Sequence, residues 1–177
     1  MRRLLPCLCL VLFGAGTVLA QDPDYPKWDF TAGFTFNRFE TPAPVSHENL
    51  YGFTGAVGWN FRKWAAVEGD ITYTTKSLNG DRVNLVTYIA GPRFTKRFSN
   101  SPAQPFVHVL IGGGHLSGFG DSTNGWAGKF GGGLDIVAGK HVAIRAFQAD
   151  YYRYHGHVNV GTQRLDNLAL TFGIRIF

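Results

Sequence analysis

In the stretch 28–39, WDFTAGFTFNRF, residues 28–37 alternate between two kinds of side chain. Large apolar residues such as Trp28, Phe30 and Phe34 take every second position, and small or polar residues such as Thr31 and Thr35 lie between them. A period of two is typical of a β-strand with two unlike faces. The run exceeds an ordinary strand of about 5–6 residues and is long enough to cross a bilayer, which takes roughly 9–11 tilted residues. Its aromatic face therefore covers either a soluble core or lipid.

The same alternation recurs along the rest of the chain and gives an even number of strands. We expect strands at residues 28–39, 51–61, 65–75, 84–94, 105–115, 126–137, 142–151 and 165–177. Longer loops are expected at 40–49, 76–83, 116–125 and 152–164, and turns at 62–64, 95–104 and 138–141. An even count with alternating loop lengths is typical of outer-membrane barrels, and closure leaves no unpaired edge in lipid. The predicted fold is all-β, an eight-stranded antiparallel up-and-down transmembrane β-barrel.

The first 20 residues have the pattern of a secretory signal peptide. Two arginines precede an apolar run, and Val18 and Ala20 suit cleavage before Gln21. The alternative, an uncleaved anchor, is disfavoured because the run is too short to span a bilayer comfortably. Both cysteines lie inside this segment, so the mature chain is expected to contain no disulfide. We predict a signal peptide at 1–20, a short leader at 21–27 and a barrel domain at 28–177.

Composition and charge narrow the classes of function. The formal net charge of +5 includes Arg2 and Arg3, so the mature chain carries about +3, which is too mild to indicate a nucleic-acid partner. The chain has 23 glycines and 15% aromatic residues, a composition that favours strands over helices. No stretch after residue 20 approaches the roughly 18 unbroken apolar residues of a transmembrane helix.

Several motifs resemble those of a known family. They are YIAGPRF at residues 88–94, GGGLD at 131–135, IRAFQADY at 144–151 and an amphipathic last strand that ends at Phe177. The chain resembles the small eight-stranded outer-membrane β-barrel proteins, OmpA-like and OmpX-like, of Gram-negative bacteria. The resemblance implies location in the cell outer membrane, contact with outer-membrane lipid, and passage through periplasmic chaperones and the barrel-assembly machinery.

The last residue departs from the pattern of that family. Phe177 shares the parity of Arg175 and not that of the lipid-facing residues. Either a bulge near the end of the strand restores its orientation, or the assembly signal is atypical.

Family resemblance also implies an ion-pair network inside the barrel. Seven charged residues fall on the alternate face of the predicted strands: Glu68, Asp70, Arg93, Lys129, Asp135, Arg145 and Arg175. A charge in a narrow lumen must be paired, because desolvation is otherwise costly. We expect Glu68 to pair with Arg93 and Asp135 with Arg145. Since eight strands leave room for little more than side chains, we interpret the network as a plug, with a gate or ion path as the alternative.

Aromatic residues near the predicted strand ends indicate two interfacial belts. The candidates are Trp28, Tyr51, Trp59, Trp64, Tyr73, Tyr88 and Trp126. A soluble aromatic core is the alternative interpretation. The parity of the seventh strand changes near Asp150, so the alternation leaves open whether Phe147 or Gln148 points inward.

Histidines and glycines suggest weaker hypotheses. His155 and His157 could bind a metal or serve a lipid A-modifying barrel enzyme, but an exposed polar loop explains them better. His108 and His115 are interpreted as lumen or rim residues. The glycine runs at 112–114 and 131–133 lack the lysine of a phosphate-binding loop and are better explained by close approach of strands.

The predicted function is a non-enzymatic barrel with a structural, envelope-integrity or adhesive role, without catalytic residues, cofactor or metal. Any extracellular partner would contact loops 40–49, 116–125 and 152–164. Two alternatives stay open at this point. One is a barrel enzyme that modifies lipid A. The other is a soluble lipocalin-like binder, which would need an apolar interior.

Overall fold

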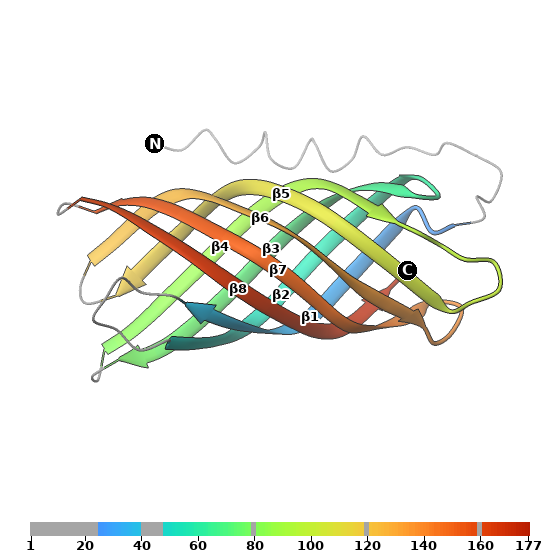
Figure 1. Ribbon diagram of the computed structural model, residues 1–177, viewed down its shortest axis with the longest axis horizontal. Helices are drawn as coiled ribbons and strands as arrows, with labels where there is room; N and C mark the ends of the chain where they lie inside the picture. The colour runs from blue at the N-terminus through green and yellow to red at the C-terminus, as the bar shows by residue number, and fades with distance from the viewer. Residues whose placement is uncertain (1–24, 40–47, 79–80, 119–120, 159–160) are drawn as a thin grey trace, which may run out of the picture.

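The computed structural model describes residues 25–39, 48–78, 81–118, 121–158 and 161–177. Its strands form a closed antiparallel barrel in sequence order, with β1 paired to both β2 and β8 (Figure 1). The strands are β1 Trp28–Phe39, β2 Glu48–Arg62, β3 Ala65–Leu78, β4 Asp81–Thr95, β5 Ala103–Gly118, β6 Asp121–Val137, β7 Val142–Val158 and β8 Gly161–Ile176. The predicted eight-stranded up-and-down barrel is confirmed. No helix in the described part of the chain is long and apolar enough to cross a membrane.

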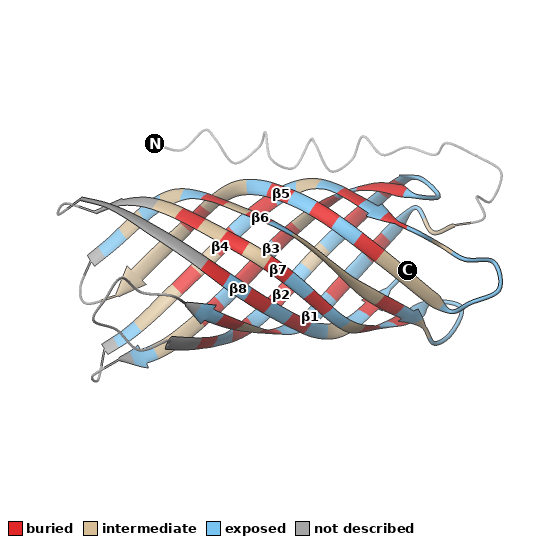
Figure 2. Ribbon diagram, viewed as in Figure 1, coloured by how far each residue is buried: buried red, intermediate tan, exposed pale blue. Residues whose placement is uncertain are grey.

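Every strand alternates between buried and exposed residues (Figure 2), and the aromatic face is the outer one. Phe34, Phe53 and Leu170 are 45%, 68% and 42% exposed, whereas Glu68 and Arg175 are each 1% exposed. A soluble barrel would place these two sets the other way round. This partition is the one that a bilayer requires, with apolar side chains toward lipid and charges sealed inside.

The strands are longer than the sequence indicated, so the predicted loops were largely wrong. Most of the expected loops at 76–83, 116–125 and 152–164 is strand, and residues 48–49 of the first expected loop belong to β2. The rest of that loop, 40–47, lies outside the described residues. The missed segments are rich in Asn, Ser, Thr and Gly. A strand that extends beyond the bilayer has water on its outer face, so it does not need the apolar alternation that marks a spanning segment.

A β-bulge in β7 resolves the ambiguous parity of that strand. Ala146 has no partner on β6, and the pairing with β8 shifts between Arg145 and Gln148. One extra residue reverses the facing of everything beyond it. As a result Phe147 is 45% exposed, while Gln148 is 1% exposed and points into the barrel along with Arg145.

Both ends of the barrel sequence lie at one end of the molecule. The start of β1, the chain's last residue and the turns at 63–64, 96–102 and 138–141 lie at the right of Figure 1. The pairing of β8 with β1 runs without a register shift to Ile176. The bulge that could have reoriented Phe177 is therefore absent from this pairing. The Phe177 ring lies 5.5 Å from the Arg175 guanidinium, on the same side of the strand.

We expect deletion of Ala146 to abolish folding. Without the extra residue, either Arg145 or the polar residues after it must turn toward lipid. The measurement is heat-modifiable migration on a gel, because a folded barrel resists detergent and migrates differently after boiling. Deletion of Asn100, which is exposed in the 96–102 turn, is the control and leaves folding intact. Normal folding of the Ala146 deletion would contradict the role assigned to the bulge.

Candidate functional site

The barrel interior is the most chemically organised part of the molecule. All seven charged residues expected inside are buried there, each 6% exposed or less. Three further residues join them that the sequence analysis did not assign to a network: Asp29, His108 and Asp150. Alternation on each strand directs these side chains to the lumen, and the barrel closure brings strands distant in sequence within hydrogen-bonding reach.

Nine of the interior side chains form a closed ring of hydrogen bonds, which we call the polar ring. Its members in order are Asp29, Arg93, Glu68, His108, Asp150, Gln148, Arg145, Asp135 and Arg175, which bonds back to Asp29. Seven of the eight strands contribute, and β2 adds Asn60 as a side branch on Asp29. A ring of this kind braces opposite walls of the barrel directly through its lumen.

Asp29 bonds to three other side chains in and beside the polar ring. Its carboxylate accepts hydrogen bonds from both terminal nitrogens of Arg93, at 2.5 and 3.0 Å. It also accepts from Arg175 Nη2 at 3.0 Å and from Asn60 Nδ2 at 2.6 Å. A bidentate arginine–carboxylate pair fixes both distance and orientation. Asp29 therefore connects β1 to β2, β4 and β8 through one functional group.

His108 joins two carboxylates across the lumen. Its Nδ1 lies 2.8 Å from Glu68 Oε1, and its Nε2 lies 2.8 Å from Asp150 Oδ1. Glu68 also accepts from Arg93 Nη1 at 2.6 Å, the pair expected from the sequence. An ionised carboxylate only accepts hydrogen bonds, so when both carboxylates are ionised the two ring nitrogens donate and the imidazole carries its second proton.

The other half of the polar ring is centred on Arg145. It donates to Asp135 through Nε at 2.8 Å, the second pair expected from the sequence, and to Gln148 Oε1 through Nη1 at 2.6 Å. Its guanidinium lies 4.4 Å from the centre of the Phe106 ring, a cation–π contact inside the barrel. The bulge at Ala146 is what allows Arg145 and Gln148 to face the lumen together.

Lys129 and Asp70 form a second buried pair beside the ring. Lys129 Nζ lies 2.8 Å from Asp70 Oδ2 and 3.8 Å from Asp150 Oδ2. With this pair the described interior holds five carboxylates and four permanent cations. Protonated His108 supplies the fifth positive charge, so the buried charges balance, as a low-dielectric interior requires.

The absence of a side chain at Gly131 leaves room for the polar ring. A Cβ atom on Gly131 would overlap the Asp150 carboxylate and the Ala149 carbonyl oxygen. The runs at 112–114 and 131–133 both lie within strands and allow close approach, so they are not phosphate-binding loops.

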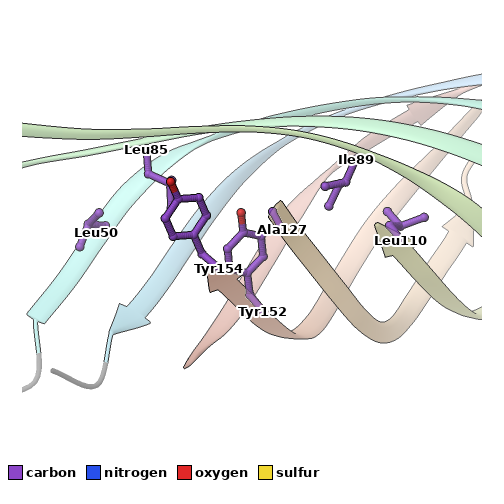
Figure 3. Packing of buried hydrophobic residues seen from close by; sticks show 7 residues of the cluster. All are labelled: Leu50, Leu85, Ile89, Leu110, Ala127, Tyr152 and Tyr154. Atoms are coloured by element: carbon purple, nitrogen blue, oxygen red, sulfur yellow. The ribbon is translucent and has the colours of Figure 1, made fainter. Parts of the chain in front are cut away.

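Beyond the charged groups, threonines and then apolar residues fill the interior. The hydroxyls of Thr35, Thr54 and Thr72 bond in series and reach Asp70, and Thr171 bonds Thr35. The cavity that these side chains line has a volume of about 10 Å³, roughly one water molecule. An apolar cluster follows, made of Leu50, Leu85, Ile89, Leu110, Ala127, Tyr152 and Tyr154 (Figure 3).

The seven aromatic residues expected in the belts are all exposed on the outer surface, between 41% and 59%. Trp28 and Trp59 are paired across β1 and β2, and Trp64 stacks on Phe94 near the end that holds the start of β1 and Phe177. Tyr88 lies at the midpoint of β4 rather than at a strand end.

Two histidines outside the ring contact neighbouring side chains. His115 Nδ1 lies 2.7 Å from Asn124 Oδ1, and the His155 ring lies 6.0 Å from the Trp126 ring. The side chain of His157 lies outside the described residues. Among the side chains that the structure describes, no group of three or more His, Cys, Asp or Glu residues could hold a metal ion.

The sequence profile of the outer membrane protein β-barrel domain family matches residues 5–175 of the chain. This match covers nearly the whole sequence, and the closed barrel with charges inside and apolar residues outside agrees with it. The chain belongs to this family. It is therefore a protein of the cell outer membrane, and the alternative of a soluble lipocalin-like binder is wrong.

Two solved structures have the same fold as this chain. Neisserial surface protein A superimposes with a TM-score of 0.69 at 13% identity, covering 85% of this chain and 97% of that one. Ail, the attachment invasion locus protein of Yersinia pestis, gives a TM-score of 0.53 at 19% identity, covering 84% and 97%. No curated protein sequence matches the chain. At these identities the likeness extends to the fold alone.

Replacing Asp29 with Asn is expected to lower the free energy of unfolding by about 3–5 kcal/mol, the cost of breaking a buried ion pair from one side. The change leaves Arg93 and Arg175 without the carboxylate that they share. Urea titration of the protein folded in vesicles measures the effect. Thr31→Val is the control on the same strand, because the Thr31 hydroxyl is buried without a hydrogen-bond partner and its loss is expected to cost less than about 1 kcal/mol. Equal costs for the two changes would contradict the bracing role of Asp29.

Proposed function

We propose that the protein is a closed, non-enzymatic barrel that contributes to the integrity of the outer membrane. The observation that carries this proposal is the polar ring, in which nine buried side chains from seven strands bond to one another across the lumen. Its charges are engaged with one another, and the cavity beside it holds about 10 Å³. An interior arranged in this way stabilises the barrel and leaves no continuous path for ions.

A closed lumen predicts that the purified protein conducts no ions. In planar bilayers we expect no conductance steps, whereas the double variant Glu68→Ala/Arg93→Ala should show them. That variant removes one carboxylate and one guanidinium together, so it opens space without changing the net charge. Heat-modifiable migration verifies that the variant folds. Steady conductance by the unaltered protein would exclude the plug and favour the ion-path interpretation.

A second candidate, an adhesive role at the cell surface, is supported by strand length. The strands β5, β6, β7 and β8 have 16 or 17 residues, against the roughly 9–11 that span a bilayer. The surplus extends the barrel wall beyond the membrane as paired strands, which form a rigid surface for a partner. The name of Ail, an attachment invasion locus protein with the same fold, is consistent with such a role.

A deletion strain of the parent bacterium distinguishes these functions in one experiment. We expect the deletion to raise the uptake of large antibiotics and to leave the mass profile of lipid A unchanged. Complementation with the unaltered gene and with His155→Ala/His157→Ala should restore the barrier equally. A changed lipid A profile that only the unaltered gene corrects would establish the enzyme. Normal permeability together with lost adherence to host surfaces would favour the adhesive role over the structural one.

A further inference from the structure

A hollow lies at the rim of the barrel, at the end that holds the start of β1 and Phe177. It has a volume of about 590 Å³ and lies where the 63–64 turn meets the end of β4 and the start of β5. Three exposed apolar side chains, Trp64, Phe94 and Val107, line it on the lipid-facing side. The Trp64 and Phe94 rings are stacked with centres 5.8 Å apart, which makes a flat and rigid wall. The hollow therefore presents apolar surface to the membrane.

Three cations, Lys63, Lys96 and Arg97, also line the hollow. Lys96 Nζ lies 5.3 Å from the Phe98 ring, and Arg97 donates to Asn60 Oδ1 at 3.1 Å and to the Lys63 carbonyl oxygen. None of the three forms an ion pair with a carboxylate in the residues that the structure describes. Their positive charge is thus left for a group that is not part of the described chain.

Arg97 keeps its charge at neutral pH. Burial, together with the nearby charges of Arg175 and Arg93, lowers the pKa of Arg97 to about 10. The nearby Asp29 carboxylate acts in the opposite direction, but it is engaged with Arg93 and Arg175 in the polar ring. The carboxylates of the polar ring are therefore paired with the cations of that ring, and none of them forms an ion pair with Lys63, Lys96 or Arg97.

We propose that this hollow binds one anionic glycerophospholipid, with its phosphate among Lys63, Lys96 and Arg97 and one acyl chain along Trp64, Phe94 and Val107. The cations require a negative headgroup, and the apolar wall beside them requires a chain that a soluble anion lacks. An aromatic residue next to basic side chains is the composition expected at a membrane interface. Because the short turns of an outer-membrane barrel face the periplasm and the hollow lies at the end with the short turns 63–64 and 138–141, we place the site in the inner leaflet. The site does not depend on whether the lumen is closed.

Fluorescence quenching at Trp64 tests the proposal. In a protein that carries Trp28→Phe, Trp59→Phe and Trp126→Phe, Trp64 reports on the lipid in the hollow. The protein is folded into phosphatidylcholine vesicles that contain either dibrominated phosphatidylglycerol or dibrominated phosphatidylcholine. We expect phosphatidylglycerol to be preferred at least about fivefold, the factor that one basic side chain near an anionic surface supplies.

Two charge variants separate this site from general attraction. Lys63→Gln/Lys96→Gln/Arg97→Gln should abolish the preference. The matched variant Lys27→Gln/Arg62→Gln/Lys140→Gln removes as much charge from the same end of the barrel and should retain it. If the first variant does not fold, Lys63→Gln/Lys96→Gln replaces it, since both lysines are exposed, and should lower the preference severalfold.

Four outcomes would overturn the proposal. Equal quenching by the two lipids would show that the hollow does not select charge. Equal loss in the matched variant would show attraction to the whole basic end. Displacement by glycerol phosphate would show an anion site without a chain, and stronger competition by lipid A would assign the hollow to a different lipid.

Discussion

The Asp29 carboxylate is the contact on which the architecture most depends. It lies on the first strand and accepts from Arg93 on β4 and Arg175 on β8. Backbone pairing already joins β1 to β8, but it acts only around the circumference of the barrel. The Asp29 contacts act through the centre, and they belong to a ring that returns to its starting point. A barrel with few apolar side chains at this level of its interior is stabilised there by ion pairs, which hold only while both partners remain.

The outer surface of the barrel is apolar and its interior is polar, and one extra residue in a strand can decide which of the two a side chain faces. Phe147 and Gln148 are neighbours in sequence, yet one faces lipid and the other bonds to Arg145. The alternation alone would place Arg145 and Gln148 on opposite faces. Ala146 is a small residue without a pairing partner on β6, and this extra residue lets both Arg145 and Gln148 face the lumen.

Much of this arrangement could be predicted from the sequence because it depends on alternation between near neighbours. The number of strands, the lipid-facing set and the Glu68–Arg93 pair follow from the period of two and from the adjacency of β3 and β4. The bond between Arg175 and Asp29 joins residues 146 positions apart, so no local pattern indicates it. Asp29 itself lies on the polar face of the first strand and could have been assigned to the network by the same parity rule. Asp150 could not be assigned in this way, because the bulge at Ala146 reverses the alternation of β7 before the strand reaches that residue.

The closed form of the polar ring has a consequence for how the barrel can enter the membrane. A sheet of seven strands, without β8, would lack Arg175 and would expose Asp29 and Asp135 with their negative charge only partly neutralised. Such an intermediate would carry free backbone edges and excess charge into hydrocarbon at once. Pairing of β8 with β1 therefore closes the barrel and balances its buried charges in the same step. This coupling favours concerted, all-or-none insertion over the accumulation of half-inserted sheets.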